Sequence, residues 1–207
     1  SMHLISSMTN RSTRLLTSGV MTKRLTEIAH ALIAEVAAPG DCVIDATMGN
    51  GYDTLFLAQH VGHRGHVYAF DIQQQALEQT AARLLQEEVR RHVTLIRGDH
   101  ARMLDLLSGS MHGKASAVVF NLGYLPGGEK SITTSAESTL GALDAALELL
   151  RPGGIISLLV YVGHTGGEEE HRAILHWLEE VRGRARWKHH NPDSAACSPR
   201  LYSIIKA

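Results

Sequence analysis

The sequence predicts an α/β fold in which helices cover both faces of a seven-stranded, mostly parallel sheet. Two observations favour this class: short apolar runs alternate along the chain with segments of helical periodicity, and a glycine-rich turn follows the first run. The chain has 207 residues, which suits a single domain whose core is large enough to fold without disulfides or a structural metal.

The helices are expected where apolar side chains recur every three or four residues. The first begins at Thr22 and ends at Pro39. It carries Leu25, Ala29 and Ile33 on one face. The remaining helices are expected at 54–60, 73–90, 101–107, 133–150 and 168–181.

The strands are expected where short apolar runs are bounded by turn residues. They cover 42–46, 65–70, 93–96, 116–120, 155–161, 185–189 and 201–205. The last two are expected to close the sheet as an antiparallel hairpin. The others alternate with helices and are therefore expected to run parallel.

Residues 1–21 differ from the rest because they contain no acidic residue and are rich in Ser and Thr. We expect a flexible N-terminal tail or a tag remnant there, with a transit peptide as the alternative. Residues 22–207 are expected to form one domain, since no repeat or low-complexity linker interrupts them.

The overall composition excludes several classes of protein. Lys and Arg total 20 against 21 Asp and Glu, so net charge alone does not attract nucleic acid, although a local basic patch can. No apolar run approaches the roughly 20 residues of a membrane span. Cys42 and Cys197 are far apart in sequence, which is typical of a reducing compartment. We expect a cytoplasmic protein, or an organellar-matrix protein if residues 1–21 are a transit peptide.

The turn after the first strand has the composition of a ligand-binding loop. Gly49 and Gly51 allow the backbone to approach a ligand at the point where the next helix begins. Thr54 stands where a dinucleotide-binding loop has its third glycine. The carboxylates of Asp45 and Asp53 would repel a pyrophosphate, so they favour a cationic ligand instead.

Polar side chains also follow the second and third strands. Asp71 comes 20 residues after Gly51, where a carboxylate accepts hydrogen bonds from a ribose diol. Asp99 or His100 can reach an adenine edge. Three successive strand ends thus carry an acidic loop, a carboxylate for the ribose and a residue for the adenine. This arrangement is typical of S-adenosylmethionine (SAM) binding.

The loop after the fourth strand, residues 121–134, is the most distinctive segment. It begins with Asn121, followed by Tyr124 and Pro126, and parallels the Asn-Pro-Pro-Tyr loop of amino-group methyltransferases. A reacting amine must present its lone pair to the methyl group while acceptors hold its N–H groups aside. The side-chain carbonyl of Asn121 can do this, and Tyr124 can stack on an unstacked base.

These motifs identify a family resemblance that runs from about residue 24 to residue 206. The segments 45–54, 67–73, 121–128, 130–134 and 161–164 resemble the SAM-dependent rRNA methylase family, typified by bacterial tRNA 5-(aminomethyl)-2-thiouridine methyltransferase. The resemblance implies a Rossmann-like fold and methyl transfer from SAM to the primary amine of a tRNA wobble uridine. Together, the strand ends and the resemblance give as cofactor contacts Asp45, Thr47, Gly49, Asn50, Gly51, Asp53, Thr54, Asp71, Ile72, Gln73, Asp99, His100 and Asn121.

Three residues are candidates for catalysis: Asn121, Tyr124 and His164. His164 follows the fifth strand and could take a proton from the substrate ammonium, with a structural loop histidine as the alternative. The candidate substrate contacts are Leu122, Gly123, Tyr124, Pro126, Gly127, Tyr161, His164, Arg184, Arg186 and Lys188.

The last three of these form a basic stripe. Alternation along a strand puts Arg184, Arg186 and Lys188 on one face, where they could bind RNA phosphates or form a solvated face. His60, His63 and His66 do not suggest a metal site, because Gly62 and Gly65 break the helix between them.

The sequence therefore predicts an N-methyltransferase that uses SAM and acts on 5-aminomethyl(-2-thio)uridine at the tRNA wobble position. We expect the anticodon stem-loop as partner, no membrane and no metal, and the sequence leaves a homodimer open. Two alternatives remain: a SAM enzyme acting on rRNA or a small-molecule amine, and a non-catalytic protein that binds SAM or RNA.

Overall fold

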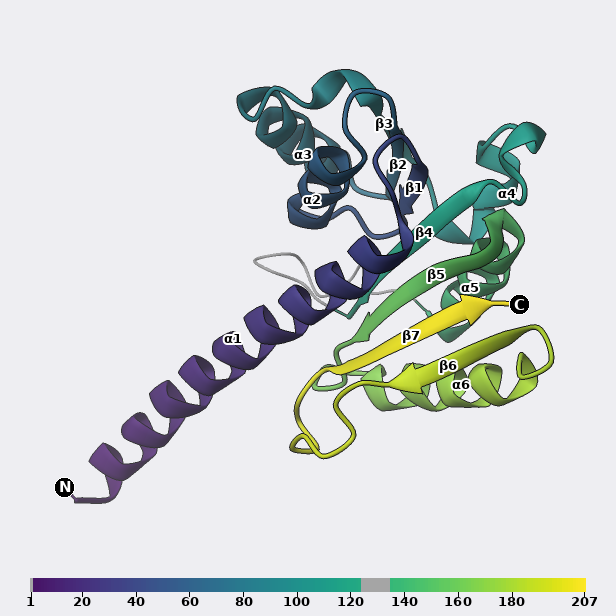
Figure 1. The fold of residues 1–207 in the computed structure, drawn as a ribbon. Helices are drawn as coiled ribbons and strands as arrows, with labels where there is room; N and C mark the ends of the chain where they lie inside the picture. Colours follow the sequence, from purple (N-terminus) through teal and green to yellow (C-terminus); the bar gives the residue numbers. More distant parts are fainter. Residues whose placement is uncertain (1, 124–134) are drawn as a thin grey trace.

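The computed structural model describes residues 2–123 and 135–207, and for residues 2–18 it describes the helix backbone alone. The described residues form one sheet with helices on both faces (Figure 1). The strands are β1 (Cys42–Asp45), β2 (His66–Asp71), β3 (Val93–Arg97), β4 (Ala115–Leu122), β5 (Leu150–Val160), β6 (Ala185–His189) and β7 (Arg200–Lys206). The helices are α1 (Met2–Val36), α2 (Tyr52–Val61), α3 (Gln74–Gln86), α4 (Met103–Leu106), α5 (Ala136–Leu149) and α6 (Gly167–Glu180).

The sheet has the order β3-β2-β1-β4-β5-β7-β6 within the described chain. The first five strands in this order run parallel, and β7 is antiparallel to both β5 and β6. This confirms the predicted parallel sheet and its antiparallel hairpin. The chain moves outward from β1 to β3 and then returns to place β4 beside β1. The order of the strands therefore reverses between β1 and β4. The carboxyl ends of these two strands mark the switch point, where ligands bind in open α/β sheets.

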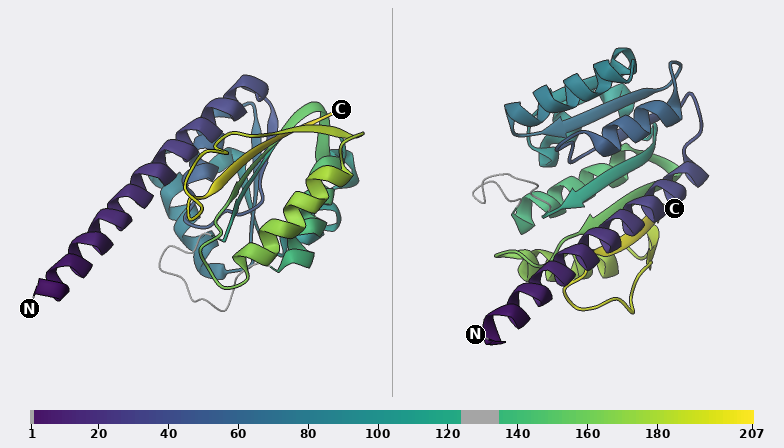
Figure 2. Two further views of the ribbon diagram at one scale, coloured as in Figure 1. Left: turned by 90° about the horizontal axis from the view of Figure 1, so that it is seen from below. Right: turned by 90° about the vertical axis from the view of Figure 1, so that its left-hand side faces the viewer.

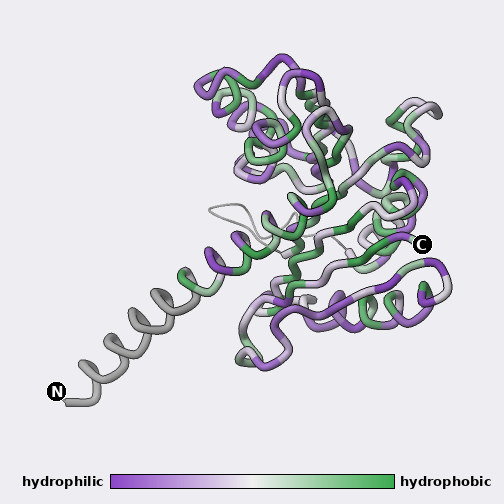
Figure 3. The backbone as a smooth tube through the Cα atoms, viewed as in Figure 1, coloured by the Kyte–Doolittle hydropathy of each residue, from purple (hydrophilic) through white to green (hydrophobic). Residues whose placement is uncertain are grey.

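Helices lie on both faces of the sheet (Figure 2), and an apolar layer holds them to it on each face. On one face, Ile33 of α1 packs with Leu57 of α2 and Leu84 of α3 against the sheet. On the other face, α4, α5 and α6 pack against β4, β5 and β7. Figure 3 shows the hydrophobic residues gathered in the central strands, while α3 carries hydrophilic stretches.

Each expected helix shifts at one or both ends, and two of these shifts have a clear local cause. The helix expected over 73–90 stops at Gln86 because Glu88 adopts a positive φ of 61°, which an α-helix does not tolerate. The helix expected over 133–150 begins at Ala136, since the Ser135 hydroxyl accepts a hydrogen bond from the Ser138 amide as an N-cap.

The N-terminal segment departs most from expectation. Residues 1–21 are expected to be flexible, yet α1 begins at Met2 and continues without interruption to Val36. The segment holds no proline and one glycine, Gly19, so little in it breaks a helix. The N-terminal half of α1 projects away from the sheet, whereas Leu25 and Ala29 in its second half pack on Leu159 and Leu201 (Figure 1). The domain boundary at residue 22 stays a prediction.

Candidate functional site

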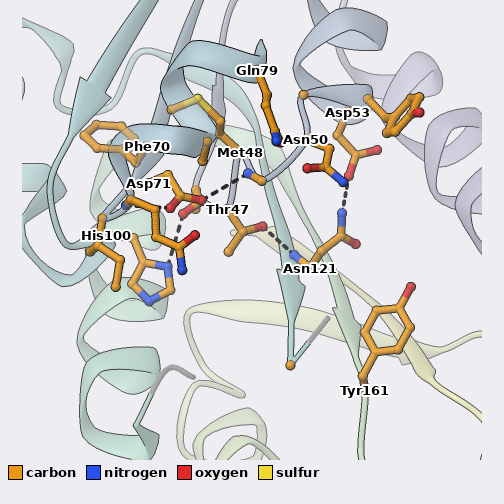
Figure 4. Close-up of a pocket in the computed structure, with 18 of the residues that line it drawn as sticks. Thr47, Met48, Asn50, Asp53, Phe70, Asp71, Gln79, His100, Asn121 and Tyr161 are labelled. Atoms are coloured by element: carbon orange, nitrogen blue, oxygen red, sulfur yellow. Dashed lines mark hydrogen bonds between the residues drawn. The ribbon is translucent and has the colours of Figure 1, made fainter. Parts of the chain in front are cut away.

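A cavity of about 810 Å³ opens at the carboxyl edge of the sheet. Its wall comes from the β1–α2 loop and from the ends of β2, β3 and β4, which meet at this edge because the strands are parallel. The volume lies within the roughly 300–1,000 Å³ range of small-molecule sites. Figure 4 shows the side chains converging on this space.

Asp45, at the end of β1, lies beneath the loop and not on the cavity wall. It is fully buried and accepts hydrogen bonds from the Thr54 hydroxyl at 2.7 Å and from the Thr47 amide at 3.1 Å. Burial, followed by the negative charges of Asp53 and Asp71, raises the pKa of Asp45 to about 7. Asp45 and Thr54 therefore hold the loop in shape, while the loop itself faces the cavity.

The β1–α2 loop packs so tightly that it leaves no space for a side chain at Gly51. Gly51 has a φ of +85°, and a side chain there would meet the Thr80 hydroxyl at 2.7 Å. That hydroxyl also donates to the Gly49 carbonyl at 3.2 Å, and Arg83 Nε donates to the Asn50 carbonyl at 2.8 Å. The loop backbone is thus fixed against α3, with its amide groups at the cavity edge.

Asp71, at the end of β2, lines the cavity. One carboxylate oxygen accepts the Gly49 amide at 3.1 Å and the other accepts the Gln73 amide at 2.9 Å. Each carboxylate oxygen has two acceptor sites, so a ribose diol can still bind. Ile72 beside it is 46% exposed and gives this end of the cavity an apolar surface.

His100 closes the far end of the cavity. It is 5% exposed, and its Nδ1 lies 3.2 Å from the Ala46 carbonyl, so Nδ1 carries the proton. Burial lowers the pKa of His100, which keeps the ring neutral. Its Nε2 is buried without a partner in the described structure and can accept a hydrogen bond from a ligand amino group.

Asp99 is held in place from two sides. Partial burial raises its pKa, but the hydrogen bonds from the Ala101 amide and the Ser138 hydroxyl, both at 2.9 Å, together with the charge of Arg102, outweigh this and lower the pKa overall. The carboxylate therefore stays ionised at the cavity wall and links the end of β3 to α5.

Asn121, at the end of β4, faces the β1–α2 loop. Its backbone amide donates to the Thr47 hydroxyl at 2.7 Å, and its side-chain Nδ2 donates to Asp53 (Figure 4). The other oxygen of Asp53 lies 2.6 Å from Nε2 of His30 on α1. The His30 ring stacks on Phe56 with 3.8 Å between centroids and 2° between planes.

Most predicted site residues are brought together at the cavity. Those on its wall are Thr47, Gly49, Asn50, Gly51, Asp53, Asp71, Ile72, Gln73, Asp99, His100, Asn121, Gly123 and Tyr161. Leu122 was predicted to contact the substrate, and the structure contradicts this. The residue is 1% exposed and its side chain belongs to the core, because alternation along β4 turns it toward α5. Tyr124, Pro126 and Gly127 lie outside the described residues.

His164 does not line this cavity in the described structure. Its ring packs so closely on Gly123 that a side chain at Gly123 would lie 2.3 Å from Cε1. Its Nδ1 is buried without a partner, and the residue borders a separate hollow with Arg172. This placement favours the structural alternative, in which His164 shapes the end of β4.

The basic stripe follows the outer strand of the sheet. Arg186 and Lys188 are exposed on β6, while Trp187 between them packs on the core. Arg184 is exposed just before the strand. The predicted alternation is present, and phosphate binding by these residues stays a prediction.

Sequence reasoning missed one wall of the cavity, which is formed by α1. Its cavity-lining residues are Thr22, Lys23, Thr26, Glu27 and His30. A signal was available, since polar residues at 22, 26 and 30 recur every four positions beside the apolar 25, 29 and 33.

Two kinds of feature are absent from the described residues. They contain no group of three or more His, Cys, Asp or Glu side chains that could hold a metal ion. None of their helices combines the length and the apolar character needed to cross a membrane.

Known proteins resemble this chain in sequence and in structure. The family described as "Putative rRNA methylase" matches residues 67–204. A curated relative from Arabidopsis thaliana, named tRNA (mnm(5)s(2)U34)-methyltransferase, chloroplastic, is 46% identical over 72% of this chain and 56% of its own length. The chain thus spans about half the length of that relative.

Two solved structures match this chain over nearly their whole length. One, described as "putative rRNA-methylase" from Clostridium thermocellum, is 39% identical with a TM-score of 0.82. The other, described as "a putative methyltransferase" from Streptococcus mutans in complex with SAH, is 34% identical with a TM-score of 0.77. Each alignment covers 88% of this chain and 97% of the solved chain.

The raised pKa of Asp45 predicts a pH-dependent stability. The ordinary pKa is 3.8 and the folded value is about 7, so the folded protein keeps a proton that the unfolded chain releases in this window. The free energy of unfolding should therefore fall as pH rises from about 4 to 7 and then level off. Asp45→Asn, whose amide cannot ionise, should lack this component, on the order of 1–4 kcal/mol.

Urea unfolding at several pH values measures it, with Asp105→Asn, at an exposed position, as the matched control. Parallel pH profiles for wild type and Asp45→Asn would contradict the assignment.

Proposed function

The chain belongs to the "Putative rRNA methylase" family, and from this premise we propose that it is a SAM-dependent N-methyltransferase of RNA. The substrate we propose is the primary amine of 5-aminomethyl(-2-thio)uridine at the tRNA wobble position. The observation that carries the proposal is the side-chain amide of Asn121, fixed at the switch point beside a cavity with nucleoside-binding groups.

The residues of the cavity fit SAM. Asp71 accepts the ribose hydroxyls, the buried Nε2 of His100 accepts the adenine amino group, and Ile72 packs on the base. The carboxylates of Asp53 and Asp71 favour a ligand with a positive sulfonium. SAM supplies an activated methyl group, so the protein's own part is to bind and to orient.

Asn121 handles the amine. The substrate ammonium first releases one proton to water. The side-chain carbonyl of Asn121 then accepts a remaining N–H of the amine and thereby turns the nitrogen lone pair toward the methyl group. Tyr161 lines the same part of the cavity and borders the space that the base would enter (Figure 4). Binding alone would not need an amine-orienting group, which argues against the non-catalytic alternative.

An RNA substrate is supported from two directions. The name of the Arabidopsis relative specifies a modified wobble uridine of tRNA, whereas the family description specifies rRNA. The exposed Arg186 and Lys188 offer contacts to a phosphate backbone, which a small-molecule amine would not need. The relative at 46% identity favours tRNA over rRNA.

The Arabidopsis relative also bears on the cellular compartment that we propose for this chain. Its name includes the word chloroplastic, which supports the organellar alternative over the cytoplasm expected from the cysteine content.

Asp71→Ala should weaken SAM binding. The substitution removes the acceptor for the ribose and also frees the Gly49 amide that Asp71 holds. A hydrogen bond to a charged group contributes roughly 1.5–3 kcal/mol, so the affinity should fall about tenfold or more. Calorimetric titration with SAM measures this, with Glu78→Ala, at an exposed position on α3, as control. Unchanged affinity would remove Asp71 from the cofactor site.

Asn121→Ala tests the proposed reaction. Because Asn121 orients the amine, turnover should fall by ~10²–10³ while SAM affinity stays close to that of wild type. The measurement is a single-turnover assay with saturating SAM and tRNA that carries the aminomethyl group, followed by nucleoside analysis. rRNA and a small amine serve as competing substrates.

Near-wild-type rates for Asn121→Ala would exclude the role of Asn121. Methylation of rRNA in preference to tRNA would overturn the choice of substrate.

The basic stripe makes a separate prediction. Replacing Arg184, Arg186 and Lys188 with Gln should raise the Michaelis constant for tRNA and flatten its salt dependence by about one counterion per lost contact. SAM affinity should not change, because β6 is separated from β1 and β4 in the sheet. If tRNA binding and its salt slope are both unaffected, the stripe is a solvated strand face.

A further inference from the structure

α1 places a histidine at the cavity that no step described above uses. His30 is held from three sides: its Nε2 is 2.6 Å from Asp53, its ring stacks on Phe56, and the helix around it is anchored by the buried Ala29 and Ile33. Its side chain is 23% exposed, so it is partly enclosed and still borders the cavity.

Asp53 connects His30 to the proposed catalytic residue. One oxygen of its carboxylate faces His30 Nε2 and the other accepts from Asn121 Nδ2. The Asp53 side chain is 11% exposed, so water offers it few other partners. His30, Asp53 and Asn121 therefore form one chain of hydrogen bonds that joins α1, α2 and β4.

This chain determines which way the Asn121 amide points. An ionised carboxylate only accepts hydrogen bonds, so the NH₂ group of Asn121 must face Asp53. The carbonyl oxygen is then turned away from Asp53, as Figure 4 shows. If the amide rotated by half a turn, it would present N–H donors to the N–H groups of the amine, and the amine would lose its acceptor.

His30 keeps Asp53 in the orientation that this requires. The backbone of Asn121 is already fixed by Thr47, but its side-chain amide depends on the position of the Asp53 carboxylate. We propose that His30 is a positioning residue for methyl transfer, which acts through Asp53 to turn the carbonyl oxygen of Asn121 toward the substrate amine. The proposal rests on the proposed function, because it assigns that oxygen to the amine.

A double-mutant cycle tests the proposal. His30→Ala should lower the single-turnover rate by on the order of 10–100-fold, as for residues that orient a ligand through one hydrogen bond, with little change in SAM affinity. In the Asn121→Ala background, the same substitution should have almost no further effect. His30→Gln should recover much of the rate, because its side-chain N–H can reach the place of Nε2. Glu35→Ala, at an exposed position on α1, is the matched control and should match wild type.

A packing role predicts other results. If His30→Ala slows wild type and Asn121→Ala by the same factor, His30 acts independently of Asn121 and the proposal fails. It also fails if His30→Gln folds, as thermal unfolding shows, and is as slow as His30→Ala.

A second readout needs no substrate and separates this inference from the proposed function. In the free protein, the side-chain NH₂ resonances of Asn121, identified by their loss in Asn121→Ala, should shift in His30→Ala and stay in place in Glu35→Ala. This result would support the positioning role even if tRNA were not methylated. Unshifted resonances would overturn the role whatever the substrate.

Discussion

The buried carboxylate of Asp45 is the interaction on which the site is built. It accepts the Thr54 hydroxyl and the Thr47 amide, which fixes the start of α2 and the loop after β1 in one arrangement. The Thr47 hydroxyl in turn accepts the backbone amide of Asn121, so β4 is aligned to the same loop. A single buried group thus determines the relative placement of the β1–α2 loop and Asn121 across the switch point.

The electrostatics of the site follow from three carboxylates that lie close together. Asp45, Asp53 and Asp71 lie close enough that the charges of the other two raise the pKa of Asp45. Such repulsion destabilises the free protein, and bound cations reduce it. The proposed reaction brings together a sulfonium and an amine that arrives protonated, and these two would repel each other in an uncharged cavity. An acidic site therefore suits a reaction between two cationic partners.

The sequence predicted the fold and the strand-end residues well, because both depend on local patterns. Apolar runs gave the strands, and parallel strands necessarily bring Asp71, His100 and Asn121 to one edge. The periodicity of α1 indicates a polar face that contains His30, but it does not reveal what that face contacts, because the contact between His30 and Asp53 joins residues 23 positions apart. His164 and Leu122 were expected at the site from their place in a loop or motif, but the direction of a side chain depends on packing.

The position of β6, the outermost strand of the hairpin, also bears on aggregation. β6 lies at the edge of the sheet, so one side of its backbone has no neighbouring strand in the described structure. Such an edge can pair with the sheet of another molecule and start aggregation, and exposed charged side chains are a common protection against this. Arg186 and Lys188 stand on that strand, so the residues that would attract a polyanion also keep one copy of the sheet from extending into the next.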